Sequence, residues 1–219
     1  MFRSFINEEF YSQRVSSQEM DALLASGWRH FGTHFFRYNL GIYENEIRLV
    51  IPLRIRLSGF TLSKSQRRIL RKNQDLQVIT RPIEITEEKE ILFDHHKQRF
   101  KSGVPDSIYD FLDKNVANTP CEGFEICVYD KEKLLAASFF DVGETSISGI
   151  YAMFAPEEAK RSLGIFTMLL EIDFAIRNEK IFYYQGYCYN GNSYYDYKKQ
   201  FRGTEKFDWR GNWEWFEEK

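Results

Sequence analysis

Hydrophobic and polar positions follow different patterns along the chain. Aromatic and β-branched residues dominate residues 28–57 and are interrupted by short polar turns, which is typical of antiparallel strands. Residues 122–129, 134–141 and 146–154 are strand-forming runs separated by polar turns, which predicts a three-stranded meander. Apolar residues at helical spacing then predict a long amphipathic helix that includes residues 169–176.

Capping residues and further apolar runs predict the remaining elements. They are helices at 16–27, 63–73, 107–114 and near 193–201, a helix from Thr86 to about Ser102, and strands at 76–83 and 181–186. This pattern predicts a mixed α+β fold with a mostly antiparallel central sheet flanked by helices. We expect a strand-rich N-terminal region with a basic helix, residues 1–80, and a second domain, residues 81–219, or else one compact unit.

The helix predicted at 63–73 has a strongly basic face. Ser63 and Gln66 have the spacing of a capping box, which favours a helix start there. With Arg54 and Arg56 upstream, residues 54 to 72 hold seven basic residues and no acidic one. The face is either simply solvated or binds the phosphates of a nucleic acid. Its basic residues, spaced as one helix face, are Lys64, Arg67, Arg68, Arg71 and Lys72.

Composition limits the possible partners and compartments. The formal net charge of the 219 residues is −2, so a polyanion has to be bound by a local patch. No apolar run approaches the ~20 residues of a membrane span, and the N-terminus lacks the features of a signal peptide. Three sparse cysteines without metal-ligand spacing indicate reduced thiols. We therefore expect a cytoplasmic protein that does not bind a membrane.

The order of meander, loop, helix, strand, helix and strand is that of the acyltransferase fold called GNAT. In that fold the backbone N–H groups at the start of the helix point at a phosphate. Here the loop contains Arg161, Ser162 and Gly164, and Phe166 takes a position that is small in proteins that bind coenzyme A. A benzyl group there argues against coenzyme A, although not against a phosphate nearby.

Short motifs in a fixed order cover the chain from residue 20 to about 205. They are Gly27-Trp28-Arg29-x-Phe31-Gly32, Phe35-Phe36-Arg37, Ser63-x-Ser65-Gln66-Arg67-Arg68, Arg71-x-Asn73, Asp75-Leu76, Arg161-Ser162-Leu163-Gly164, Tyr184-x-Gly186-Tyr187, Tyr197-Lys198 and Phe201-Arg202 with Glu205. In these motifs the chain resembles the tRNA-dependent aminoacyl-protein transferases, the arginyl- and leucyl-tRNA–protein transferases of the N-degron pathway.

The resemblance implies transfer of Arg or Leu from charged tRNA to the N-terminal amine of an acceptor protein, usually one that begins with Asp or Glu. It implies a GNAT-like catalytic half, and we expect a monomer with no cofactor besides the aminoacyl-tRNA co-substrate. One departure is clear: residues 38–43 contain none of the cysteines that the family usually carries near there. If His30 and His34 lie on one strand, they are roughly 13 Å apart, too far to share an ion. We therefore predict no metal site.

An aminoacyl ester is an activated donor, so the enzyme needs no nucleophile of its own. Positioning, a modest proton acceptor and stabilisation of the oxyanion remain to be supplied. Asp141, at the end of the second meander strand, could orient or deprotonate the amine, or only begin a turn. Tyr151 and Tyr187 could donate hydrogen bonds to the oxyanion or to the tRNA 3′ end, or only pack in the core.

The resemblance and the charge pattern together predict the tRNA contacts. Trp28 could stack on the terminal adenine, or belong to the core, and with Arg29 it is our candidate contact to the acceptor or to the 3′ end. Lys198 and Arg202, one helical turn apart, either hold phosphate or are exposed charges. The complete set of predicted aminoacyl-tRNA and phosphate contacts is Lys64, Arg67, Arg68, Arg71, Arg161, Ser162, Gly164, Lys198 and Arg202.

Two other functions remain open on the sequence alone. One is a GNAT N-acyltransferase that uses acyl-coenzyme A. The other is a non-catalytic adaptor that binds tRNA or N-terminal degrons. The transferase hypothesis makes a geometric demand of its own. It requires the basic helix and the Arg161 loop to lie on the same side of the molecule, so that both can contact one charged tRNA.

Overall fold

The computed structural model describes residues 4–100, 103–114 and 117–216. Two sheets and four α-helices make up most of this part of the chain. Their bounds are β1 Asn7–Tyr11, α1 Ser17–Ala25, β2 Arg29–Phe31, β3 His34–Tyr38, β4 Leu40–Tyr43, β5 Glu46–Arg56, α2 Lys64–Lys72, β6 Gln77–Pro82, α3 Glu87–Lys97, β7 Gly123–Asp130, β8 Lys133–Val142, β9 Ser146–Phe154, α4 Leu163–Arg177, β10 Phe182–Tyr189, β11 Thr204–Phe207 and β12 Trp213–Trp215. Short 3₁₀ helices are η1 Leu57–Gly59, η2 Ile108–Asp110, η3 Pro156–Arg161 and η4 Tyr194–Gln200.

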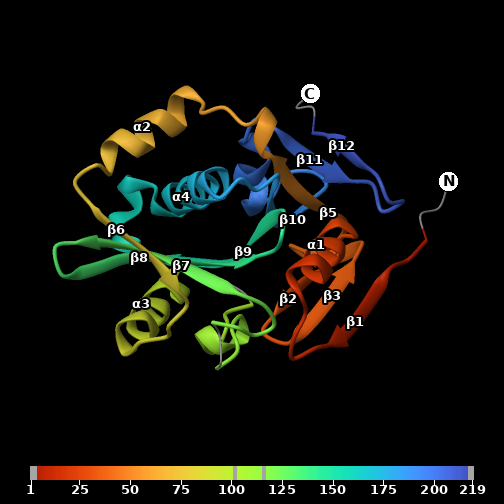
Figure 1. Ribbon diagram of the computed structural model, residues 1–219, viewed down its shortest axis with the longest axis horizontal. Coiled ribbons are helices and arrows are strands. Elements are labelled where there is room, and N and C mark those ends of the chain that lie inside the picture. Colours follow the sequence, from red (N-terminus) through yellow and green to blue (C-terminus); the bar gives the residue numbers. More distant parts are fainter. Residues whose placement is uncertain (1–3, 101–102, 115–116, 217–219) are drawn as a thin grey trace.

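The main sheet has the order β12-β11-β5-β10-β9-β8-β7-β6, with β4 paired to β5. Its pairs are antiparallel except for β9 and β10, which run parallel and are joined through α4. A smaller sheet has the order β1-β3-β2. Helices α4 and α2 cover one face of the main sheet and α3 lies on the other face (Figure 1). This is the predicted mixed α+β architecture, with a mostly antiparallel central sheet flanked by helices.

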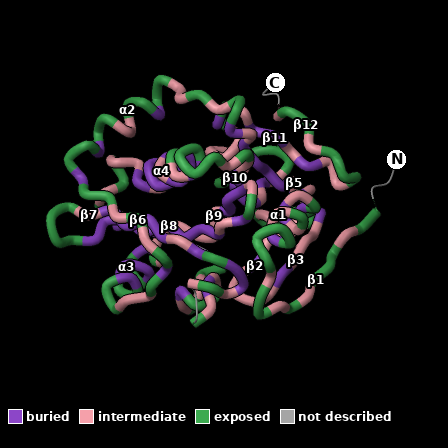
Figure 2. The backbone as a smooth tube through the Cα atoms, viewed as in Figure 1, coloured by how far each residue is buried: buried purple, intermediate pink, exposed green. Residues whose placement is uncertain are grey.

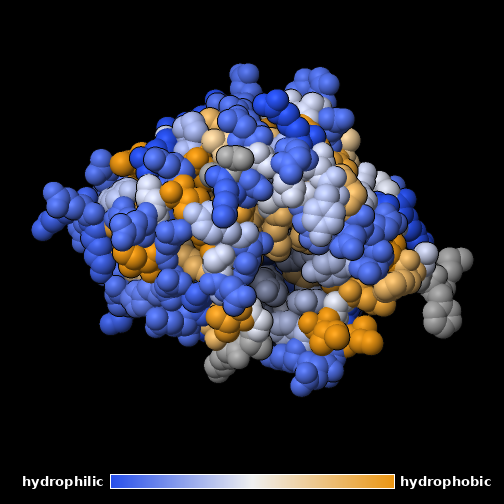
Figure 3. Space-filling view, turned by 90° about the horizontal axis from the view of Figure 1, so that it is seen from below, coloured by the Kyte–Doolittle hydropathy of each residue, from blue (hydrophilic) through white to orange (hydrophobic). Residues whose placement is uncertain are grey.

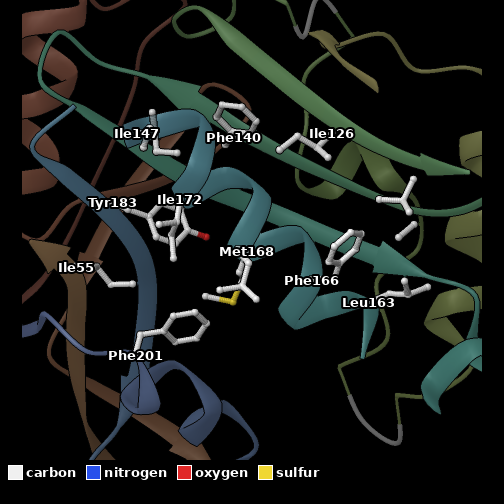
Figure 4. Packing of buried hydrophobic residues seen from close by; sticks show 14 of the residues in the cluster. Ile55, Ile126, Phe140, Ile147, Leu163, Phe166, Met168, Ile172, Tyr183 and Phe201 are labelled. Atoms are coloured by element: carbon white, nitrogen blue, oxygen red, sulfur yellow. The ribbon is translucent and has the colours of Figure 1, made fainter. Parts of the chain in front are cut away.

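The largest core cluster lies between α4 and the main sheet. Ile172 and Phe166 of α4 pack with Phe140 and Ile147 of the sheet (Figure 4). Burial follows the centre of the sheet and α4, whereas α2 is mostly exposed (Figure 2). Removal of this apolar surface from water is the main contribution to the stability of such a layer. The same core fixes the start of α4, which carries the predicted phosphate loop.

Strand β5 joins the two predicted regions. It lies between β11 and β10, with Ile55 paired to Tyr183 on one side and to Thr204 on the other. Strand β6 of the N-terminal region forms the opposite edge of the same sheet, beside β7. The main sheet is therefore built from residues on both sides of position 80.

Several predicted elements differ in length from those observed. The helix expected at 107–114 is only the η2 turn, because the Ser107–Asp110 capping box closes a single turn and Ile108 and Leu112 then turn into the core. Helix α3 ends at Lys97, and its expected end at Ser102 lies outside the described residues. Strand β10 is longer than expected because it continues along β5 after a register shift.

Candidate functional site

Strands β9 and β10 pair over three positions only and then separate. Their parallel pairing ends at Tyr184 and Ser148, and β10 continues with a register shift between Tyr184 and Gly186. Beyond that point Gly149 of β9 and Gly186 of β10 face side chains from other elements. The separation of these two strands brings charged groups from distant parts of the chain into the sheet.

Arg29 and Lys198 approach this separation from β2 and η4. The Arg29 guanidinium donates hydrogen bonds to the Ser148 hydroxyl and to the Gly149 carbonyl, and Lys198 Nζ donates to the Tyr187 carbonyl at 3.1 Å. Burial, with the nearby Arg29 charge, lowers the pKa of Lys198 to about 8. Burial also lowers the pKa of Arg29. The two cations are therefore buried next to each other with neutral hydrogen-bond acceptors, and the carboxyl groups of Asp141 and Glu171 lie near Arg29.

The buried carboxyl group of Glu171 lies next to Gly149. Tyr183 Oη donates to Glu171 Oε2 at 2.6 Å, and a Cβ atom on Gly149 would lie 3.2 Å from that oxygen. Burial raises the pKa of Glu171 to about 7, although the Tyr183 hydrogen bond opposes the shift. Glu171 was missed from the sequence. A signal was present, because it is an acidic residue on the apolar face of the helix predicted over 169–176.

The predicted catalytic residues have different hydrogen-bond partners, although Asp141 and Tyr187 both lie near enough to Arg29 to oppose the lowering of its pKa. Asp141 is buried, and its Oδ2 lies 2.7 Å from Nε2 of His30, so the two residues connect β8 to β2. Tyr187 Oη donates to the Gly27 carbonyl at 2.7 Å. Tyr151 stacks on a neighbouring phenyl ring, and its buried hydroxyl has no hydrogen-bond partner among the described residues. A role of these three residues in the reaction stays a prediction.

The basic helix and the Arg161 loop are neighbours. Lys64, Arg67, Arg68 and Arg71 are exposed on α2, whose capping box is present as predicted. At the end of α2 the Arg161 guanidinium binds both carboxylate oxygens of Asp75, at 3.0 and 2.9 Å. Asn73 Nδ2 also donates to the Arg161 carbonyl at 3.0 Å. The two predicted phosphate-binding segments therefore share one side of the molecule.

Within the loop, Arg161 also bonds to Glu158, so its charge is balanced by two carboxylates of this chain. Ser162 has left-handed φ and ψ angles of 57° and 44° and precedes α4 without a side-chain cap. The first N–H groups of a helix have no intrahelical partner, so those at Leu163 and Gly164 can face an anion. The backbone of the loop is thus better suited to bind phosphate than the Arg161 side chain.

Phe166 does not block this loop. Its side chain is buried in the core under α4 and points away from the helix start (Figure 4). The steric reason given for excluding coenzyme A is therefore wrong, because the helical turn directs this position inward. That the chain does not use coenzyme A stays a prediction without that argument.

Two further expectations about charge are wrong. Arg54 and Arg56 do not extend the basic face of α2, because both donate to Glu205, at 2.6 and 2.8 Å. Lys198 and Arg202 do not act as neighbours on a helix, because η4 ends before Arg202 and the backbone becomes extended. Arg202 instead donates to Thr61 Oγ1 at 3.2 Å.

Trp28 and the histidines have partners within the fold. The Trp28 ring packs on Phe10, and the Arg37 guanidinium lies 5.0 Å from its centroid. His30 and His34 belong to two paired strands, not one, and His34 Nε2 lies 2.7 Å from Oε2 of Glu9. Within the described ranges no group of three or more His, Cys, Asp or Glu residues is placed to hold a metal ion. In the same ranges no helix is long and apolar enough to cross a membrane.

Comparison with known proteins assigns the family. The sequence model of the family described as "Arginine-tRNA-protein transferase, C terminus" matches residues 88–208. An "Aspartate/glutamate leucyltransferase" of Campylobacter jejuni subsp. jejuni serotype O:6 is 28% identical over 200 residues, which cover 89% of this chain and 82% of that protein. A protein of the same name from Xanthomonas campestris pv. campestris (strain B100) is 34% identical over 176 residues, 75% of this chain and 69% of that protein. The chain belongs to the tRNA-dependent aminoacyl-protein transferases, which are enzymes.

Among solved structures, L-PGS from Bacillus licheniformis matches with a TM-score of 0.43 and 15% sequence identity. The match covers 85% of this chain and 55% of that one, so this chain spans about half of its length.

Proposed function

We propose that this protein transfers leucine from leucyl-tRNA to the N-terminal amine of proteins that begin with Asp or Glu, and so marks them for the N-degron pathway in the cytoplasm. The names of the similar proteins support leucine as the donated residue and acidic residues as acceptors. The observation that carries the proposal is the contact of the basic helix α2 with the start of α4. Further along α4, Glu171 lies beside Gly149, where β9 and β10 separate.

In this proposal the tRNA lies along α2. Its five exposed cationic side chains contact backbone phosphates, which gives affinity that depends on salt and not on base sequence. The N–H groups at the start of α4 bind a phosphate near the 3′ end. From there the aminoacyl ester reaches the point where the pairing of β9 and β10 ends.

The reaction at that point is the aminolysis of an ester. The nitrogen of the acceptor amine forms a bond to the leucyl carbonyl carbon, and the ester C–O bond breaks. The terminal ribose of the tRNA leaves as a free hydroxyl and takes up the proton that the amine loses. The α-amine has an ordinary pKa near ~8, so only a modest proton acceptor is needed. Positioning of the two substrates supplies most of the acceleration.

A transfer assay with radiolabelled aminoacyl-tRNAs tests this function. Leucyl-tRNA and arginyl-tRNA are each mixed with peptides that differ only in a first residue of Asp, Glu, Asn or Ala. We expect leucine label on the Asp and Glu peptides. Binding of charged tRNA without transfer to any peptide would instead indicate an adaptor, and acylation from acyl-coenzyme A would indicate an N-acyltransferase.

A further inference from the structure

We propose that Arg29 and Lys198 form the subsite that binds the side-chain carboxylate of the acceptor's first residue. This assignment rests on the proposed function and adds the residues that select the acceptor. Arg29 comes from the N-terminal sheet and Lys198 from η4, near the C-terminal end, and both reach the separation of β9 and β10.

The two cations form no hydrogen bond to a carboxylate among the described residues, although the buried carboxyl groups of Asp141 and Glu171 lie near enough to Arg29 to oppose the lowering of its pKa. Their hydrogen-bond acceptors are the Ser148 hydroxyl and the carbonyls of Gly149 and Tyr187, which are all neutral. In the part of the chain that the structure describes, neither side chain forms an ion pair. Two partly buried like charges repel each other and are poorly solvated, so a bound anion would relieve an unfavourable arrangement. Such an arrangement is typical of a site that awaits an anionic ligand.

Gly186 allows the two cationic groups to approach the backbone and each other closely. Its φ angle of +89° is one that residues with a side chain rarely adopt. A Cβ atom at this position would lie 3.3 Å from Lys198 Nζ and 3.6 Å from Arg29 Nη2. Both charged groups therefore converge over the Gly186 backbone, where a side chain would crowd them. A planar carboxylate bound beside the two groups can accept hydrogen bonds from the guanidinium and the ammonium at once.

The side of the sheet favours a protein ligand over a tRNA phosphate. Ile147 of β9 packs under α4, on the face that α2 also covers. Successive side chains of a strand point to opposite faces, so Ser148, the residue bound by Arg29, faces away from α4. Its neighbour on β10, Tyr184, packs there with the N-terminal part of the chain. Arg29 thus approaches the subsite from the face opposite the proposed tRNA path, whereas η4, which carries Lys198, packs against the α4 core through Tyr197.

The surface on that side is hollowed, and in this proposal the acceptor enters there. Figure 3 shows the molecule from the side opposite α2, and a hollow lies near the middle of this face. The N-terminal residue of an acceptor could enter here while the aminoacyl end of the tRNA arrives from the other face of the sheet. The carboxylate bound by Arg29 and Lys198 would then fix the position of the attacking amine.

The test compares acceptor peptides that begin with Asp or with Asn, which have nearly the same shape but differ in charge. The variant is Lys198→Met and the matched control is Lys199→Met, because Lys199 Nζ is already paired with Asp196 at 2.6 Å. The readout is the ratio of kcat/KM for the two peptides with leucyl-tRNA. We expect Lys198→Met to lower this ratio about 10- to 100-fold, the effect of one lost charge-assisted hydrogen bond, and Lys199→Met to leave it unchanged.

The possible failures can be told apart. An unchanged ratio in a folded Lys198→Met protein overturns the subsite and leaves the proposed function intact. If the ratio is unchanged but leucyl-tRNA binds more weakly and with a smaller salt slope, the acceptor subsite is also overturned. Arg29 and Lys198 would then bind a phosphate of the tRNA. Absence of transfer by the unaltered protein overturns the proposed function and the subsite together. Arg29→Lys, which keeps the charge but not the planar fork, provides a second variant and should lower the ratio less than Lys198→Met does.

Discussion

Two pairs of cationic side chains lie along β10, and their surroundings differ. Arg54 and Arg56 share the carboxylate of Glu205, and the Arg54 guanidinium lies 3.8 Å from the centroid of the Phe182 ring. Arg29 and Lys198 lie farther along the strand, and among the described residues they donate to neutral acceptors. In the first pair a carboxylate of the fold contacts both cations and balances one of the two charges. In the second pair neither cation forms an ion pair within the described ranges, so the first pair serves the structure and the second is suited to bind a ligand.

The largest expected effect comes from removing the charge of Glu205, which pairs with Arg54 and Arg56. Glu205→Gln leaves the buried Arg54 without its counter-charge, and removal of one partner of a buried ion pair costs about 3–5 kcal/mol of stability. Urea unfolding monitored by circular dichroism measures the loss. As a control, Glu214→Gln removes an exposed carboxylate 3.7 Å from Lys206 and should change stability by less than about 0.5 kcal/mol. Equal effects of the two substitutions would contradict the comparison.

A third group of cations, on α2, is exposed and forms no ion pair with any residue that the structure describes, so it should affect tRNA binding and not stability. We expect Arg67→Ala combined with Arg68→Ala to weaken tRNA binding roughly tenfold and to lower the slope of log K against log salt by about 1–2, because each lost phosphate contact contributes roughly 0.7–0.9. Filter binding at several salt concentrations measures both quantities. A salt slope equal to that of the unaltered protein would remove α2 from the tRNA path.

Replacement of Lys198 should raise the stability of the protein, whereas replacement of Glu205 should lower it. Lys198→Met eliminates a partly buried charge near Arg29, so we expect it to raise the free energy of unfolding at pH 7 by on the order of 1 kcal/mol, or about 2–4 °C in Tm. Thermal unfolding without ligands measures this. A loss of stability instead would mean that the Lys198 charge is compensated in the fold.

The difference in the free energy of unfolding between Lys198→Met and the unaltered protein should change with pH in a definite direction. The pKa of Lys198 is lowered by burial from 10.5 to about 8. Between these two values the unfolded chain binds the proton and the folded chain does not, so stability from this group rises with pH there. Below about pH 8 the cost of the buried charge is fully present. The advantage of Lys198→Met over the unaltered protein should therefore shrink from about pH 8 to about pH 10.5.

The smallest expected effect concerns acceptor choice. Among the described residues, the titratable or charged groups facing Lys198 are Arg29 of β2, Cys188 of β10 and Tyr195 of η4. As the pH rises through about 8, Lys198 loses its charge in the empty site, so the preference for Asp over Asn peptides should fall a few-fold. Taking the ratio of the two kcat/KM values cancels the titration of the acceptor amine. A ratio that stays constant from pH 7 to pH 9 would contradict this prediction.

Local signals predicted the elements well. Ser63 and Gln66 form the expected capping box, the three meander strands are present, and α4 follows the Arg161 loop. Such features depend on residues a few positions apart, so composition and spacing contain them. Order and motifs also indicated the family, which comparison with known proteins confirmed. The same local reasoning placed the side chain of Phe166 at the phosphate loop, although the helix turns it into the core.

The sequence by itself determined where helices and strands begin, which helix face is basic and which family the chain belongs to. The tertiary structure alone decided the state of each charge, because neutralisation depends on groups that meet only after folding. Arg54 lost its predicted role when Glu205 was brought beside it by β11, and Arg29 met Lys198 because β9 and β10 separate at Gly149 and Gly186. Electrostatic energy falls off over a few ångströms in space and does not follow distance along the chain. The sequence pattern could therefore identify the cations but not the ones that remain without a partner.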